Sequence, residues 1–278
     1  MKVNIFATIF FLLFNYSAFA STSKIKIVTS ITPLAAIIAM LLGDYAEIAS
    51  IANNNDCPHH YHLKPSDLQK VKEADMVFYI DDSFDSFASK LMNKHGQNVI
   101  KISDLTKLNL IAANWHIWLD LQNVKILLEQ LSSILAKQFP EISSEIYRNL
   151  DLAQKRIDTL IAFKEKELAS LKDVILLSDS LVYLFEEQKY KVQKLYSGNQ
   201  KSLKYVDNLE ALLAKSASKC LVLSSEQDSK MYQNFKANIV QVESENWEVK
   251  QITSDLFYEQ YLKIISNITK CTQALNDI

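Results

Sequence analysis

Glycine and proline are scarce in this chain, which has three Gly and four Pro among 278 residues. Both residues interrupt helices and are common in turns, so their scarcity argues against a turn-rich β architecture and favours long helices. No charge of one sign dominates either, since 30 Lys and Arg stand against 32 Asp and Glu. A near-neutral chain of this kind favours neither a nucleic-acid partner nor an anionic lipid surface. Beyond residue 20, no apolar run suggests a membrane span.

Motifs of nucleophilic and hydrolytic enzymes are also absent. The sequence contains no HExxH helix, no GxSxG turn and no glycine-rich phosphate loop. We therefore expect a protein that is not an enzyme. An extracytoplasmic metallohydrolase remains the alternative from another class, because it needs only a metal with an open coordination position and a nearby general base. Three carboxylates are candidates for that base: Asp179, Glu226 and Glu243.

The first twenty residues are typical of a secretory signal peptide. Lys2 supplies the positive charge, residues 5–14 the apolar segment, and Ala-Phe-Ala at 18–20 a cleavage site of the A-x-A type. We expect cleavage after Ala20 and export of a soluble chain to an oxidising, extracytoplasmic space. No cysteine follows the cleavage site, so a lipid anchor is not expected.

The three cysteines divide by position. Cys220 and Cys271 flank the last third of the chain, and in an oxidising compartment they are natural disulfide partners. On the chain-entropy argument, closing a loop of that size stabilises a fold by roughly 4 kcal/mol. Cys57 is left over, two residues before a histidine, where it is either a soft metal ligand or a small buried residue.

Hydrophobic periodicity predicts strands that alternate with helices. Short apolar segments predict strands at 24–28, 46–51, 76–80, 174–177, 220–223 and 238–242. Helices are predicted to begin at Thr32, Ser66, Asp120, Ser178 and Ser254. Strands separated by helices form parallel sheets through right-handed crossovers.

A long polar segment from residue 141 to about 171 contains neither glycine nor proline. Its length and charge suit one helix that joins two domains. The predicted fold class is therefore α/β, with two doubly wound domains joined by a long backbone helix. The expected parts are a signal peptide (1–20), an N-terminal α/β domain (21–140), a linker helix (141–171) and a C-terminal α/β domain (172–278).

Four of the five histidines lie in two short segments. His59, His60 and His62 fall within four residues, and His116 lies between two tryptophans. Imidazole is the commonest protein ligand for borderline divalent metals, and zinc favours a small set of nitrogen, oxygen and sulfur donors. The two segments therefore predict a metal site in the N-terminal domain, the alternative being a polar surface loop and one core histidine. His95 precedes a glycine and is expected on a surface turn.

Open α/β sheets bind ligands beyond the carboxyl ends of their strands. His59 and His116 each lie in a segment that leads into a predicted helix, whereas Ser178 and Glu243 each follow a predicted strand. These positions come from both halves of the chain. We therefore expect the metal site in the cleft between the two domains.

Both histidine segments resemble a known family. The sequence PHHYHLKPSD at 58–67 looks like the first metal-ligand motif of the periplasmic zinc- and manganese-binding proteins of ABC importers (the cluster A-I solute-binding proteins), in particular the ZnuA-like zinc branch. HIWLD at 116–120 looks like the second motif of that family. The likeness covers essentially the whole mature chain, including the long helix, the segment 178–183 and Glu226. Cys220 and Cys271 also match a cysteine pair of the zinc members.

The resemblance implies four ligand positions, which this chain keeps unevenly. His59 and His116 occupy the first two. The third, usually a histidine or glutamate, is Ser178, whose neutral hydroxyl is a poor zinc ligand. The fourth, usually an aspartate followed by proline, is Glu243, which keeps a carboxylate and loses the proline.

The missing third donor has two candidate replacements, His60 and His62, and the alternative for both is a solvated loop. The resemblance further implies a monomeric periplasmic protein that captures Zn²⁺ and delivers it to an inner-membrane ABC permease. Mn²⁺ or another divalent metal is the alternative ion, bound at an altered site.

Overall fold

The computed structural model describes residues 24–52, 61–92, 98–185, 189–196, 200 and 202–272. Within these ranges the chain forms two four-stranded parallel sheets, ordered β2-β1-β3-β4 and β6-β5-β7-β8. The strands are β1 (Ile25–Ile31), β2 (Ala46–Ala52), β3 (Met76–Tyr79), β4 (Val99–Lys101), β5 (Asp173–Leu176), β6 (Lys191–Lys194), β7 (Cys220–Ser224) and β8 (Asn238–Val242). The α-helices are α1 (Thr32–Leu42), α2 (Pro65–Glu73), α3 (Ser86–Met92), α4 (Leu121–Gln138), α5 (Ser143–Glu167), α6 (Leu203–Lys215) and α7 (Leu256–Ile268).

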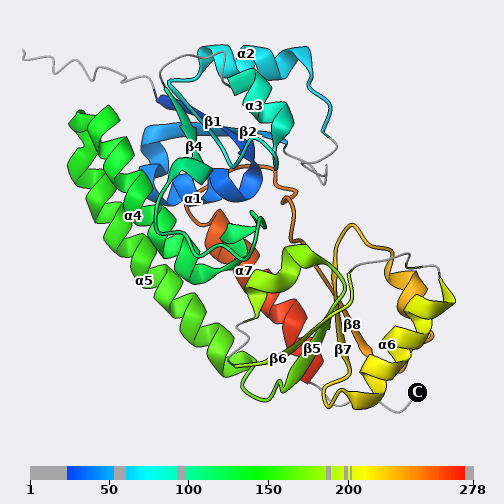
Figure 1. Cartoon of the computed structure of the whole chain (residues 1–278). Helices are drawn as coiled ribbons and strands as arrows, with labels where there is room; N and C mark the ends of the chain where they lie inside the picture. Colours follow the sequence, from blue (N-terminus) through cyan, green and yellow to red (C-terminus); the bar gives the residue numbers. More distant parts are fainter. Residues whose placement is uncertain are drawn as a thin grey trace, which may run out of the picture.

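The predicted fold class is confirmed, because each sheet with its helices forms an α/β unit and a long helix joins the two units (Figure 1). One predicted helix is wrong in type. The segment expected to form an α-helix from Ser178 is the 3-10 helix η6 (Asp179–Leu184). Its apolar residues are consecutive and all buried, so the segment has no exposed face of the kind an amphipathic α-helix needs.

Helix α1 lies at the centre of the N-terminal unit, and all eleven of its residues are buried. Pro33 stands in its first turn, where proline does not disturb the hydrogen-bond pattern. Gly43 ends it with φ 51°, a left-handed conformation that glycine adopts without steric cost. The predicted start of this helix at Thr32 is confirmed.

Helix α5 spans 25 residues, so it is roughly 37 Å long. It packs against α1 and α4 of the N-terminal unit and against α7. Figure 1 shows α4 and α5 side by side along one flank, with α5 continuing to the C-terminal sheet. Its buried apolar positions, Ile146, Ala153, Ile157 and Leu160, follow the spacing of one helix face. The long helix predicted within residues 141–171 is present as α5, which is shorter at both ends.

The chain crosses between the two units a second time after β8. Asn246 follows that strand and accepts a hydrogen bond from the Thr32 backbone N–H at 2.9 Å. The same side chain donates to the carbonyl of Ala52 at the end of β2, at 3.0 Å. The chain then returns as α7, whose Tyr261 hydroxyl donates to the carbonyl of Leu119 at 2.7 Å. The N-terminal and C-terminal units are thus tied together by polar contacts as well as by α5.

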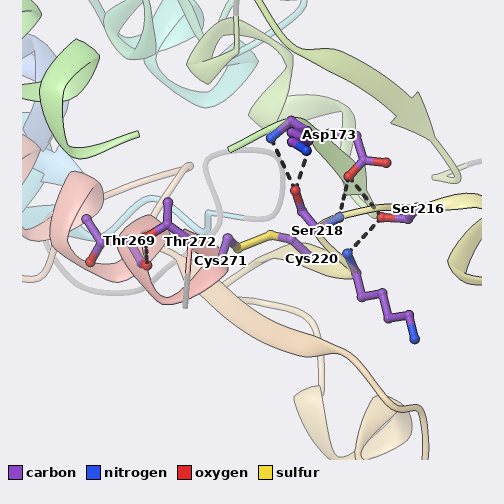
Figure 2. The surroundings of a disulfide bond; sticks show 9 residues. Asp173, Ser216, Ser218, Cys220, Thr269, Cys271 and Thr272 are labelled. Carbon is purple, nitrogen blue, oxygen red and sulfur yellow. Dashed lines mark hydrogen bonds between the residues drawn. A yellow bond between two sulfur atoms is a disulfide. The ribbon is translucent and has the colours of Figure 1, made fainter. Parts of the chain in front are cut away.

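Cys220 at the start of β7 is bonded to Cys271 just after α7, as predicted (Figure 2). Both cysteines are buried. The bond fixes the end of the chain that follows α7 to the central part of the C-terminal sheet. No helix in the described part of the chain is long and apolar enough to cross a membrane.

Candidate metal centre

His116 is held in an apolar frame at the junction of the two units. The next three residues form a short, fully buried 3-10 helix, η4 (Ile117–Leu119). The imidazole packs edge-on against Phe84, with ring centroids 5.2 Å apart, and lies 5.3 Å from the Trp118 ring. Only 6% of His116 is exposed. The apolar residues around this histidine therefore fix the ring in place and remove it from bulk water.

Both ring nitrogens of His116 have polar partners. Nδ1 lies 2.7 Å from Oδ1 of Asn114, and Nε2 lies 2.7 Å from Oε2 of Glu245. Glu245 follows β8 and is 8% exposed, so a nitrogen donor of one unit meets a carboxylate of the other in a nearly dry setting. Nitrogen and carboxylate oxygen belong to the donor set of zinc and of other first-row divalent ions.

The residues on either side of Glu245 hold it in position. Ser244 is buried and shares hydroxyl hydrogen bonds with Ser180 (2.7 Å) and Ser224 (3.1 Å) of the C-terminal unit. Asn246 is bound to backbone groups of the N-terminal unit, as described above. The carboxylate between them is therefore anchored on both sides of the junction.

Phe84 is itself positioned by the adjacent carboxyl group of Asp85. This side chain is fully buried and accepts hydrogen bonds from the backbone N–H groups of Ile80 (2.8 Å) and Asp81 (2.9 Å). Burial raises the pKa of Asp85 to about 6, although these hydrogen bonds act in the opposite direction. Asp85 thus fixes the loop after β3 on which the imidazole packs.

Glu243, the position expected to supply the carboxylate, does not meet His116. Its Oε1 lies 2.6 Å from Nζ of Lys263 on α7. Glu243 and Glu245 are separated by one residue, and both follow β8, which ends at Val242. The carboxylate at the junction is therefore the second one, which the sequence alone did not distinguish from the first.

Ser178 lies at the carboxyl end of β5, as expected, and is half-buried. Its hydroxyl is 2.8 Å from the hydroxyl of Ser180, the first member of a chain of serines that continues to Ser244. Two hydrogen bonds in series, through the Ser180 hydroxyl, therefore connect Ser178 to Ser244, the residue before Glu245. No contact between Ser178 and His116 is found within the described ranges.

The first histidine segment is described only from Tyr61 onward, so His59, His60 and Cys57 lie outside the described residues, as does His95. His62 is exposed. Tyr61 donates to the Asp67 carboxylate at 3.0 Å, and the backbone N–H of Lys64 donates to the same carboxylate at 2.9 Å. The end of the segment is thus hydrogen-bonded to the first turn of α2. This helix begins at Pro65, one residue before the predicted start at Ser66.

The two donors that are described fit a divalent ion after a small separation. Two ligands at about 2.1 Å from a tetrahedral zinc ion are roughly 3.4 Å apart, so His116 Nε2 and Glu245 Oε2 would have to separate by less than an ångström. A third His, Cys, Asp or Glu does not join them in the part of the chain that the structure describes. Further ligands would have to come from outside that part, or from water and hydroxyl groups.

Two α/β units are joined by a long helix, and a nitrogen donor and a carboxylate meet between them. The chain matches the family described as "ZnuA: Zinc-uptake complex component A periplasmic" over residues 27–274. This protein therefore belongs to the ZnuA-like family of periplasmic metal-binding proteins, as the two histidine motifs indicated. Members of this family are substrate-binding components of importers and not enzymes.

The relatives differ in the metal that their names state. The chain is 48% identical over 265 residues to the uncharacterized protein RP014 of Rickettsia prowazekii, covering 95% of this chain and 88% of that protein. The high-affinity zinc uptake system protein ZnuA of Haemophilus ducreyi is 22% identical over 210 residues, covering 64% of this chain and 68% of that protein. The manganese ABC transporter substrate-binding lipoprotein PsaA of Streptococcus pneumoniae is 25% identical over 159 residues, covering 52% and 51%.

Among solved structures, the crystal structure of ZnuA matches with a TM-score of 0.75 and 17% identity, covering 90% of this chain and all of that one. At this identity the likeness concerns the fold. It agrees with the arrangement of two parallel-sheet units and a long helix described above.

Proposed function

We propose that this chain is the substrate-binding protein of a zinc ABC importer, which captures Zn²⁺ in the periplasm and delivers it to an inner-membrane permease. The observation that carries the proposal is the contact between His116 Nε2 and Glu245 Oε2 at 2.7 Å. It brings together two good zinc donors from different halves of the chain, both nearly dry, at the carboxyl ends of the two sheets. The proposal includes export after cleavage at Ala20 and a monomeric, unanchored protein.

The proposed ligand set combines the described pair with the first histidine segment. His59 and either His60 or His62 would complete a four-coordinate site with three imidazoles and one carboxylate. Tetrahedral coordination by four nitrogen and oxygen ligands is the geometry that zinc prefers. Glu245 takes the place first assigned to Glu243, because Glu243 is paired with Lys263. Ser178 would then be a neighbour of the site instead of a strong ligand.

Manganese is the second candidate ion, and one feature of this chain favours it. The third ligand position offers a serine hydroxyl, and the adjacent serine chain adds oxygen atoms near Glu245. Oxygen donors suit Mn²⁺ better than imidazole-rich sets do. Competition between the two ions for the purified protein, made without a histidine tag, decides between them.

The test of the proposal is zinc titration against a chelator, with single variants of the proposed ligands. His116→Ala and Glu245→Ala should each weaken binding at least tenfold, which corresponds to about 1.4 kcal/mol. Glu243→Ala is the matched control, because it removes a carboxylate that lies two positions before Glu245 and is paired with Lys263. This variant should leave zinc affinity unchanged.

Two results would contradict the assignment. Wild-type affinity in both His116→Ala and Glu245→Ala would show that the ion binds elsewhere. Loss of affinity in Glu243→Ala alone would show that Glu243, the residue first predicted, supplies the carboxylate ligand. Turnover of ester or phosphoester substrates by the zinc-loaded protein would favour the metallohydrolase over transport.

A further inference from the structure

We propose that Asn114 is a positioning residue for the proposed metal ligand His116. Its side-chain oxygen keeps the proton on Nδ1, so that Nε2 is the ring nitrogen that binds the metal ion. The inference rests on the proposed function, since it concerns the same site. Nδ1 of His116 is 2.7 Å from Oδ1 of Asn114, and Nε2 is 2.7 Å from Oε2 of Glu245. The side of the ring that faces the carboxylate is therefore the side opposite Asn114.

The orientation of the Asn114 amide follows from its other two hydrogen bonds. Its Nδ2 donates to the backbone carbonyl of Asp179 at 2.7 Å, and a carbonyl oxygen can only accept. Its Oδ1 accepts the backbone N–H of His116 at 3.0 Å. Because both contacts place the oxygen toward the imidazole, Nδ1 must be the donor in the third. Once the proton between Nε2 and Glu245 has left, an imidazole held in this way carries its lone pair on Nε2, where a metal ion can bind.

The C-terminal unit holds Asn114 in place. Besides Asp179, which begins η6, Tyr183 of the same 3-10 helix donates its hydroxyl to the Asn114 carbonyl at 2.7 Å. The same hydroxyl accepts the backbone N–H of Ile111 at 2.8 Å. Burial raises the pKa of Tyr183, which keeps the hydroxyl protonated and able to donate. The histidine of one unit is thus oriented through a residue that is fixed by the other.

The expected size of the effect follows from what such partners do in metal sites generally. A histidine ligand is oriented by the group that accepts its second N–H, and loss of that group typically lowers metal affinity about 10- to 100-fold. Asn114→Ala should therefore weaken zinc binding by this factor. Asn114→Asp should retain most of the affinity, because it keeps an acceptor for Nδ1–H while losing the donor to Asp179.

A matched control separates orientation from loop stability. Asn123 is also an asparagine that fixes a nearby loop, by two hydrogen bonds to the backbone of Asn109 at 2.7 and 3.0 Å. It is fully buried. Asn123→Ala should lower thermal stability and leave zinc affinity near that of the wild type.

The decisive readout is the protonation of the His116 ring, observed by ¹⁵N NMR on the zinc-loaded protein, alongside chelator competition with zinc alone. The wild type and Asn114→Asp should show a protonated Nδ1 and an unprotonated Nε2, whereas Asn114→Ala should lose the protected Nδ1–H signal. Wild-type affinity and an intact Nδ1–H signal in Asn114→Ala would overturn the inference. So would equal losses in Asn114→Asp and Asn114→Ala, because they would assign the effect to the bond with Asp179.

Failure of the proposed function gives a different pattern. If His116→Ala binds zinc as tightly as the wild type, the site itself is wrong, whatever Asn114 does. If His116→Ala loses binding and Asn114→Ala does not, the metal site stands and only the positioning role fails.

Discussion

Ser178 occupies the position at which the family resemblance predicts a third metal ligand. The hydroxyl belongs to a line of four serines, Ser178, Ser180, Ser244 and Ser224, whose oxygens are 2.8, 2.7 and 3.1 Å apart in turn. Serine hydroxyls both donate and accept hydrogen bonds, so the members of such a line can be hydrogen-bond partners for one another without a charged group. On the predicted ligand positions, a neutral hydrogen-bonded chain that passes through Ser244, the residue before Glu245, takes the place of a strong ligand.

A histidine at this position should restore a donor. We predict that Ser178→His tightens zinc binding, because an imidazole in the third ligand position would replace the water, hydroxyl or loop histidine that otherwise fills it, at little additional ordering cost. Zinc affinity measured against a chelator tests this. Ser225→His, at the exposed end of the neighbouring strand β7, is the control for a histidine that merely adds to the surface. Weaker or unchanged binding in a folded Ser178→His would show that residue 178 does not face the ion.

Single residues of the site differed in how well the sequence revealed them. His116 was predicted as a ligand from its place between two tryptophans, with a core histidine as the alternative, and only the structure shows it beside a carboxylate of the other unit. Nothing in the sequence favoured Glu245 over Glu243 as the carboxylate ligand. The alternation of apolar and polar residues along an extended segment does not show where that segment bends. Lys263 on α7 forms an ion pair with Glu243, which leaves Glu245 as the carboxylate at the junction. Asn114 carried no signal, because an amide becomes a positioning group only through three-dimensional contacts.

At the scale of secondary-structure elements, the turn from α6 into β7 is organised by one carboxylate. Asp173 is buried at the start of β5 and accepts hydrogen bonds from the backbone N–H groups of Ala217 (3.0 Å) and Ser218 (2.7 Å). The Ser216 hydroxyl is a third donor at 3.1 Å. Figure 2 shows this cluster beside the disulfide at Cys220. The carboxylate thus fixes the turn from which the disulfide-bonded strand begins.

The electrostatics of Asp173 lead to a pH-dependent prediction. Burial acts to raise the pKa of this carboxyl, but the hydrogen bonds from Ser218, Ala217 and Ser216 outweigh it, and the pKa is lowered. A lowered folded-state pKa contributes stability above the unfolded value, near 3.9, and this contribution is lost as the pH falls through the folded-state pKa. We predict that Asp173→Asn lowers the free energy of unfolding by about 2 kcal/mol at neutral pH.

The difference between Asp173→Asn and the wild type should shrink as the pH falls below 4. Denaturant unfolding over a series of pH values measures it. Asp207→Asn is the control, because that residue is an exposed aspartate on α6. A destabilisation of Asp173→Asn that stays constant with pH would show that shape, and not charge, matters at this position.

Elements with a clear periodicity were predictable, and the exceptions have a physical cause. Strand β8 was predicted with its observed bounds, and β2 within one residue. Strands β4 and β6 were missed. The first has three residues, and the second reads Lys-Val-Gln-Lys, so neither shows enough apolar residues to reveal a period. Both lie at sheet edges, where pairing with one neighbour decides the conformation.

At the scale of the whole molecule, the two units are joined by contacts that do not involve the proposed metal ligands. Helix α5 contacts both, and its Arg156 pairs with Asp255 at 2.6 Å, next to the start of α7. The Arg156 guanidinium also lies 4.9 Å from the centre of the Tyr258 ring. Together with the contacts of Asn246 and Tyr261, these interactions link the units at positions outside the metal ligands.

We predict that zinc binding causes little closure of the molecule. A continuous helix is a stiffer connector than loops or strands, and the segment after β8 is bound to Thr32 and Ala52 by hydrogen bonds that need no metal ion. The radius of gyration from small-angle X-ray scattering should therefore be the same with and without zinc, within error. Asn246→Ala removes both of those hydrogen bonds and should enlarge the metal-free form, so that zinc then produces a measurable contraction. A contraction of the wild type as large as that of the variant would mean that the metal, and not the protein, holds the two units together.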